Sequence, residues 1–186
     1  MISAWRSLWK RCTFVCLGFV LALPGYSAAV PEHELKLALT YKLAKFVSWP
    51  LEREQAATFR LCILGEDPFG PALDDLKSLR VKERVIAVEQ IAIIDENSAR
   101  CDLVFVSRSE AERITELLAE LDGKPVLTIS DLPRFAERGG IVELQNRDNR
   151  VGFEINVAAY KRAGLVVSSQ LLQLATLIDE PKERSP

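Results

Sequence analysis

The chain of 186 residues contains one histidine, His33, and one methionine. Catalysis by a Ser–His or Cys–His pair needs an imidazole fixed beside the nucleophile, and His33 lies near a predicted mobile end of the mature chain. Cysteine, histidine and carboxylate residues do not cluster at zinc-ligand spacing. The loop Gly65–Gly70 lacks the glycine spacing and the lysine of phosphate-binding loops. We therefore expect a protein that is not an enzyme, with no catalytic residues, metal or cofactor.

The chain also has little excess charge and no long apolar run. Its 24 basic residues face 26 acidic ones, for a net charge of −2. Nucleic-acid binding needs a clustered basic surface, so we expect no nucleic-acid partner. No stretch reaches the roughly 18 apolar residues of a membrane-spanning helix. A hydrophobic content of 48% with 27% charged residues is typical of a globular protein, and the length predicts one domain.

Residues 1–29 have the pattern of a cleaved secretory signal peptide. A positive start carrying three basic residues is followed by 12 apolar residues at 12–23, and Ser27-Ala28-Ala29 supplies small residues for cleavage after Ala29. The alternative is an uncleaved anchor, but the apolar run is too short to cross a bilayer comfortably. We expect an exported domain over residues 30–179 with a polar tail over 180–186. Residues 30–186 together carry 21 basic and 26 acidic residues, for a net charge of −5.

Removal of this segment leaves two cysteines, Cys62 and Cys101. Each lies on a strand-like run, and two neighbouring strands would bring them within bridging distance. In an oxidising compartment we expect a disulfide, which closes a loop of 39 residues and constrains the unfolded chain by about 4 kcal/mol. The alternative is two separate buried thiols. A bridge could be structural or could act as a redox switch.

Apolar periodicity in the first two thirds of the mature chain predicts alternating helices and strands. We expect a helix over 32–48, ended by Trp49-Pro50, whose apolar face carries Leu35, Leu39, Leu43, Phe46 and Val47. Strands are expected at 58–64, 85–91, 101–107 and 126–129. Further helices are expected near 69–79 and from an N-cap at Ser109 to Gly123.

The last third predicts a hairpin followed by short elements. Residues 141–144 and 150–155 form the expected hairpin, and Asn156 caps a helix that Gly164 ends. A strand at 165–167 and a helix opened by Ser168-Ser169 complete the chain. Together these elements predict a single three-layer α/β domain, with a mixed β-sheet flanked by helices.

Five motifs, in order along the chain, resemble those of the YfiR family. They are Thr40-Tyr41-Lys42-Leu43-Ala44-Lys45-Phe46-Val47-Ser48-Trp49-Pro50, Leu61-Cys62-Ile63-Leu64-Gly65, Cys101-Asp102-Leu103-Val104-Phe105-Val106-Ser107, the block Phe135–Ile141 with Arg150–Asn156, and Ser169–Ala175. The resemblance covers nearly the whole mature chain.

This resemblance implies a periplasmic regulator. Proteins of the YfiR family bind the periplasmic sensor part of an inner-membrane diguanylate cyclase and hold it inactive, which lowers cyclic di-GMP signalling and biofilm formation. It further implies that an OmpA-like outer-membrane lipoprotein can sequester the regulator, and that the regulator is a homodimer.

The resemblance also implies roles for individual residues. Cys62 and Cys101 match the cysteine pair of the strand motifs, whereas the second pair of some members is missing because no cysteine follows Cys101. A partner surface is implied around Glu154 and Tyr160, with Trp49 as a further contact. Each has a structural alternative: an outward-facing strand residue, a half-buried tyrosine and a core plug, respectively.

Two other functions remain open at this point. A periplasmic small-ligand-binding sensor would take its ligand at the open carboxyl ends of the strands. An exported hydrolase is the third hypothesis.

Overall fold

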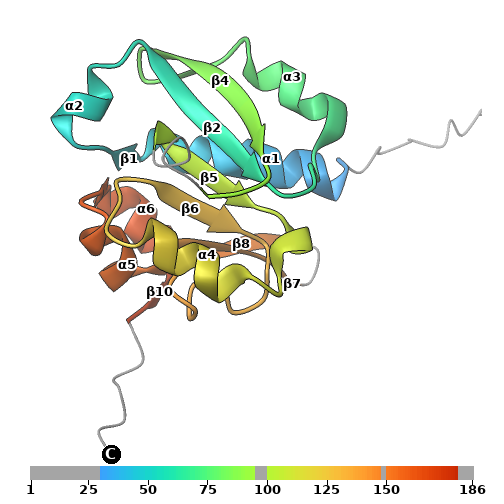
Figure 1. Cartoon of the computed structure of the whole chain (residues 1–186), viewed down its shortest axis with the longest axis vertical. Coiled ribbons are helices and arrows are strands. Elements are labelled where there is room, and N and C mark those ends of the chain that lie inside the picture. Colours follow the sequence, from blue (N-terminus) through green and yellow to red (C-terminus); the bar gives the residue numbers. More distant parts are fainter. Residues whose placement is uncertain (1–29, 95–99, 148–149, 180–186) are drawn as a thin grey trace, which may run out of the picture.

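The computed structural model describes residues 30–94, 100–147 and 150–179, and the expected signal peptide and polar tail lie outside them. A mixed sheet of eight strands runs through these residues in the order β10-β8-β7-β6-β5-β2-β4-β3 (Figure 1). The strands are β2 (Thr58–Leu64), β3 (Arg80–Val81), β4 (Arg84–Ile91), β5 (Leu103–Val106), β6 (Leu127–Ser130), β7 (Val142–Arg147), β8 (Arg150–Asn156) and β10 (Thr176–Ile178).

The centre of this sheet is parallel and its two sides are mixed. Strands β4, β2, β5, β6 and β7 run parallel, β7 and β8 form the expected antiparallel hairpin, and β3 pairs antiparallel with β4. A separate two-stranded antiparallel sheet joins β1 (Val47–Ser48) to β9 (Val166–Val167). The mixed sheet predicted from the sequence is confirmed.

Helices cover both faces of the large sheet, and α1 and α4 lie on opposite sides of it (Figure 1). The helices are α1 (Glu32–Lys45), α2 (Leu51–Glu54), α3 (Leu73–Leu76), α4 (Ile114–Leu121), α5 (Val157–Arg162) and α6 (Ser169–Leu174), with 3₁₀ turns η1 (Gly70–Ala72) and η3 (Arg108–Glu110). None of the helices in the described ranges is long and apolar enough to span a membrane.

Strand alternation divides the interior into two cores, because successive side chains of a strand point to opposite faces. On β2, Phe59, Leu61 and Ile63 enter the core that also holds Leu43 of α1. The alternate side chains Cys62 and Leu64 enter the core beneath α4. Helices on both faces of the sheet are therefore expected, because β5 is apolar at every position and the second half of β2 buries both of its faces.

The first helix differs from the prediction in its end and in its buried face. It ends at Lys45, and the next residues form β1 because they pair with β9. Leu35 and Phe46 are exposed, whereas Thr40 and Ala44 are buried beside Leu43. Thr40 tolerates burial because its hydroxyl donates to the Lys36 carbonyl oxygen at 2.8 Å. The buried face of the helix thus includes a small residue and a polar residue. A prediction from the spacing of large apolar residues does not include them.

The predicted helix N-caps are confirmed at two positions and wrong at a third. Asn156 and Ser168 accept hydrogen bonds from the amides of Ala159 and Leu171, as N-caps do. Ser109 does not cap α4, which begins five residues later; its Oγ accepts a hydrogen bond from the amide of Glu66, in the loop after β2. Strands β1, β3 and β10 were not predicted, because two or three residues carry too little periodicity.

Candidate functional site

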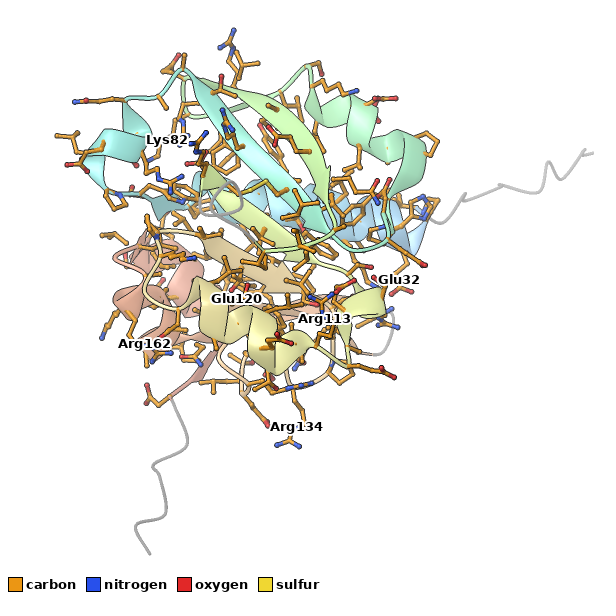
Figure 2. All side chains as sticks on the ribbon, in the orientation of Figure 1. Glu32, Lys82, Arg113, Glu120, Arg134 and Arg162 are labelled. Atoms are coloured by element: carbon orange, nitrogen blue, oxygen red, sulfur yellow. A yellow bond between two sulfur atoms is a disulfide. The ribbon has the colours of Figure 1, made fainter. Side chains whose placement is uncertain are left out.

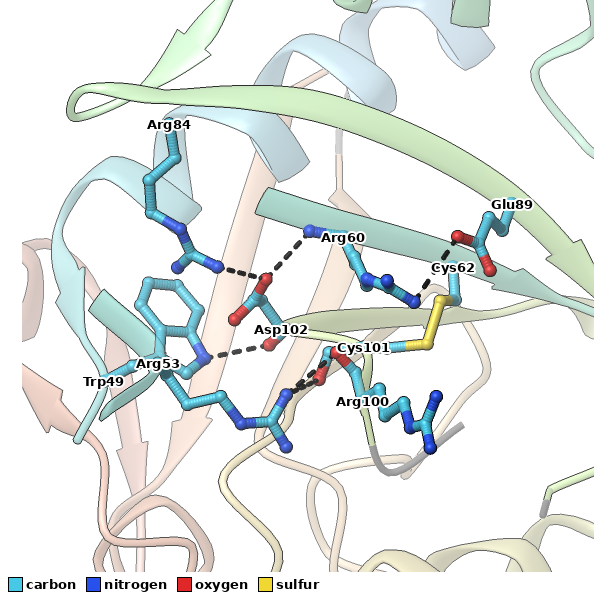
Figure 3. Close-up of a disulfide and its surroundings, with 9 residues drawn as sticks. All are labelled: Trp49, Arg53, Arg60, Cys62, Arg84, Glu89, Arg100, Cys101 and Asp102. Carbon is cyan, nitrogen blue, oxygen red and sulfur yellow. Dashed lines mark hydrogen bonds and ion pairs between the residues drawn. A yellow bond between two sulfur atoms is a disulfide. The ribbon is translucent and has the colours of Figure 1, made fainter. Parts of the chain in front are cut away.

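A disulfide joins Cys62 on β2 to Cys101, which lies two residues before β5 (Figure 3). Their Cα atoms are 6.0 Å apart, within the usual range for a bridge. Strands β2 and β5 are neighbours in the sheet, so the two cysteines meet for the reason expected from the sequence. Both sulfur atoms lie in the core beneath α4.

The next residue, Asp102, collects polar contacts from three segments on the opposite face (Figure 3). Its Oδ2 lies 2.5 Å from Nη2 of Arg84 and accepts a hydrogen bond from the amide of Arg60 at 2.8 Å. Nη2 of Arg84 also donates to the Thr58 carbonyl oxygen at 2.7 Å. Both charged side chains are buried, so this ion pair fixes the amino ends of β2, β4 and β5 against one another.

Trp49 is part of the same cluster and belongs to the core. Its side chain is 5% exposed, and the indole Nε1 donates to the Asp102 carbonyl oxygen at 2.9 Å. The indole ring meets Phe59 edge-to-face, with 5.2 Å between ring centroids. The core-plug alternative therefore describes how the indole packs in this structure.

Glu54, at the end of α2, forms a second set of polar contacts near Trp49. The Glu54 carboxylate accepts a hydrogen bond from the Trp49 amide at 3.1 Å and forms an ion pair with Lys82. The hydrogen bond from Lys82 holds the pKa of the Glu54 carboxyl below its ordinary value, although burial acts in the other direction. In this way α2 is tied to the turn between β3 and β4.

The other two residues proposed for partner binding lie in the C-terminal third. Tyr160 on α5 is 8% exposed and packs in the same core as Trp49. Glu154 is half-buried on β8, where it stands opposite Glu143 of β7 and Thr176 of β10. The structure therefore brings Tyr160 and Trp49 into one core. Glu154 lies on β8, six residues before Tyr160 in the chain.

Directly above that core lies an exposed apolar surface that sequence reasoning missed. Val47 and Val167 pair across the small sheet and are buried, whereas Val166 of β9 and Phe46, which directly precedes β1, are exposed. Phe46 is exposed and Val166 is 66% exposed. We call these two exposed residues the β1–β9 face. Leu51, the first residue of α2, is equally exposed.

The carboxyl ends of the central strands form a separate cleft of about 360 Å³. Polar and apolar residues line it together: Glu32, His33, Lys36, Pro68, Phe69, Phe105, Arg108 and Asp131. His33 therefore borders a cavity, which its position near a chain end did not predict. Within the described ranges, no group of three or more His, Cys, Asp or Glu residues is arranged to hold a metal ion.

The model of the YfiR/HmsC-like family matches residues 33–176, which include every helix of the described residues apart from Glu32, the first residue of α1. The chain belongs to the YfiR/HmsC-like family. This family consists of periplasmic proteins that regulate diguanylate cyclase signalling and are regulatory rather than catalytic. The disulfide fits the oxidising compartment in which the family works.

Proposed function

We propose that this protein is a periplasmic repressor, which binds the periplasmic sensor part of an inner-membrane diguanylate cyclase and lowers cyclic di-GMP synthesis and biofilm formation. Membership of the YfiR/HmsC-like family, over nearly the entire described domain, is the observation that carries this proposal. In the same proposal, residues 1–29 are a signal peptide removed after Ala29, which delivers residues 30–186 to the periplasm.

The β1–β9 face supports a protein partner because it exposes large apolar side chains beside a rigid core. Phe46 and Val166 would lose apolar surface to the partner, while Val47 and Val167 hold the backbone in place from below. Trp49 and Tyr160 lie in the underlying core, so their part in binding is to shape this face. Glu154 would add a polar contact from the neighbouring hairpin.

Repression requires that the protein prefers one state of the sensor. A partner that binds only the inactive state shifts the sensor toward it, in proportion to the difference in affinity. An OmpA-like outer-membrane lipoprotein that competes for the same protein would release the sensor, and a homodimer would present two copies of the surface.

The proposal is tested with the protein and the periplasmic domain of a diguanylate cyclase encoded beside it, by measuring their dissociation constant and cellular cyclic di-GMP. We expect direct binding, and a rise in cyclic di-GMP when the protein is deleted. Val166→Lys is expected to weaken binding at least tenfold, since a buried charge replaces apolar contact. Val85→Lys is the matched control, because Val85 is an exposed strand valine at the far side of the sheet.

Two results would contradict the proposal. The first is no binding to the sensor domain together with unchanged cyclic di-GMP in the deletion strain. The second is an equal loss of binding in the Val166 and Val85 variants, which would show that the β1–β9 face has no special part in it.

A further inference from the structure

The two helices that lead into the small β1–β9 sheet both end in basic residues. Lys42 and Lys45 lie in the last turn of α1, which continues into β1. Lys161 and Arg162 lie in the last turn of α5, and β9 begins four residues after this helix ends. Because β1 pairs with β9, the two helix ends meet at this sheet, with α5 and α6 on the same side of the molecule (Figure 1). Figure 2 shows Arg162 at the outline of that side.

Both stretches of sequence that build this region lack acidic residues. Residues 35–51 and 155–178 contain five basic residues and no aspartate or glutamate. The rest of residues 30–186 carries 16 basic and 26 acidic residues. The β1–β9 face therefore lies on the basic side of an otherwise acidic protein. An acidic partner is attracted to this side and repelled by the others, which orients it as it approaches.

Three of the five basic side chains are available to a partner. Lys42, Lys45 and Lys161 are exposed, and none of them forms an ion pair within the part of the chain that the structure describes. We call these three residues the basic rim. The other two, Lys36 and Arg162, are each compensated by carboxylates. The negative end of each helix offsets only about half an elementary charge, so a positive potential remains at the basic rim.

The basic rim borders apolar surface, and one of its side chains is held in place. Nζ of Lys45 lies 5.5 Å from the centroid of the Tyr41 ring, and the Tyr41 hydroxyl donates to the Arg80 carbonyl oxygen at 3.0 Å. A side chain that is already ordered loses less entropy on binding. The next residue, Phe46, is 42% exposed, and Val166 lies across the small sheet. Apolar surface with a polar rim is the usual arrangement of a protein–protein interface.

We propose that the β1–β9 face and the basic rim bind an acidic segment of the sensor that also carries apolar side chains. Those apolar side chains cover Phe46 and Val166, and the carboxylates pair with the basic rim. A protein segment is favoured over a lipid surface, because proteins that lie on membranes use the long apolar face of an amphipathic helix. Here the exposed apolar residues are at a helix end and on a two-residue strand. This inference names the chemistry of the partner and rests on the repressor function proposed above.

The test measures the association and dissociation rates of residues 30–186 with the periplasmic domain of the diguanylate cyclase encoded beside it. We expect the association rate to fall about tenfold between about 50 mM and about 500 mM NaCl, because salt screens attraction between exposed charges. Lys161→Glu is expected to lower the association rate about fivefold at the lower salt concentration. Its dissociation rate is expected to change little, since a rim charge acts mainly on the encounter of the two proteins. At the higher salt concentration the variant and the unaltered protein are expected to associate at similar rates.

Lys77→Glu is the matched control. Lys77 is an exposed lysine that directly follows α3, and its substitution changes the net charge by the same amount at a distance from the small sheet (Figure 1). Its association rate is expected to stay within about twofold of that of the unaltered protein. Lys42→Glu provides a second substitution in the basic rim and is expected to act like Lys161→Glu. Thermal unfolding verifies that each variant is folded.

The outcomes separate this inference from the repressor function. An association rate that does not depend on salt, or equal rates for the Lys161 and Lys77 variants, overturns the inference and leaves the repressor function standing. Absence of any association contradicts both. If Lys161→Glu abolishes sedimentation with phosphatidylglycerol vesicles but leaves association with the sensor domain unchanged, the face binds lipid and the inference is overturned.

Discussion

Asp102 and Arg84 form an ion pair inside the protein, with 2.5 Å between Oδ2 and Nη2 and both side chains buried. The guanidinium carbon of Arg84 also lies 5.2 Å from the centroid of the Phe59 ring. Two charges taken out of water are stable there only because each compensates for the other. The pair therefore specifies how β4 and β5 are placed on either side of β2, rather than adding much net stability.

Removal of one partner is expected to destabilise the fold strongly. Asp102→Ala leaves the Arg84 charge buried and unpaired, which is expected to lower the free energy of unfolding by about 3–5 kcal/mol. Urea unfolding measures the change. Asp74→Ala is the control, since Asp74 pairs with Lys77 at an exposed position and its loss is expected to cost less than about 1 kcal/mol. Equal effects of the two substitutions would refute the importance of the buried pair.

Loss of the disulfide is expected to lower stability without removing the fold's core contacts. Replacement of Cys62 and Cys101 by serine opens a loop of 39 residues, with an expected cost of about 2–5 kcal/mol. Chemical denaturation of the double variant and of the reduced unaltered protein is expected to give similar midpoints. Free thiols at these two positions in protein isolated from the periplasm would contradict the bridge.

Gly140 is expected to tolerate no side chain. A Cβ at this position would lie 2.1 Å from Cε1 of Phe135, which is fully buried beneath α4. Gly140→Ala therefore forces the ring or the backbone to move, and we expect a loss of about 1–3 kcal/mol in unfolding free energy. Gly152→Ala is the matched control, because no atom lies within 4 Å of its added Cβ, and it is expected to be neutral. A neutral Gly140→Ala in thermal unfolding would show that this packing is loose.

The ion pair between Glu54 and Lys82 predicts a loss of stability in acid. Because the pKa of Glu54 is lowered in the folded protein, its contribution is complete above its ordinary value of 4.5 and is lost as the pH falls below that value. The carboxylate is partly exposed, so the contribution is expected to stay below about 1 kcal/mol. Glu54→Gln is expected to lose less stability than the unaltered protein between pH 7 and pH 3. Parallel pH profiles would rule out this contribution.

The sequence predicted those elements whose signal is local. Strand β2 and the hairpin of β7 and β8 have apolar or alternating patterns, and Asn156 has the side chain that an N-cap requires. The disulfide could be predicted because it needed only two strand-borne cysteines in neighbouring strands. The strand, the hairpin and the cap depend on a few adjacent residues, whereas the disulfide joins residues 39 positions apart and was predictable because removal of the expected signal peptide leaves only two cysteines.

Features that depend on distant residues were not predictable in the same way. The pairing of β1 with β9 joins residues about 120 positions apart in the chain and involves only two residues on each side. Lys36 lies off the predicted apolar face of its helix, and its partner Asp131 is 95 positions away in the chain. The buried pair of Arg84 and Asp102 likewise has no local pattern. Such contacts become visible only when the order of the strands is known.

Cys101 and Asp102 are consecutive, and their side chains point to opposite faces of the sheet. The sulfur bridge therefore holds one side of a peptide unit while the salt bridge with Arg84 holds the other. A shift of the backbone at residues 101 and 102 would disturb the cores on both faces of the sheet, because one peptide bond connects the two side chains. Residues 101 and 102 thus make the two halves of the molecule mechanically interdependent, and neither half can loosen alone at this edge.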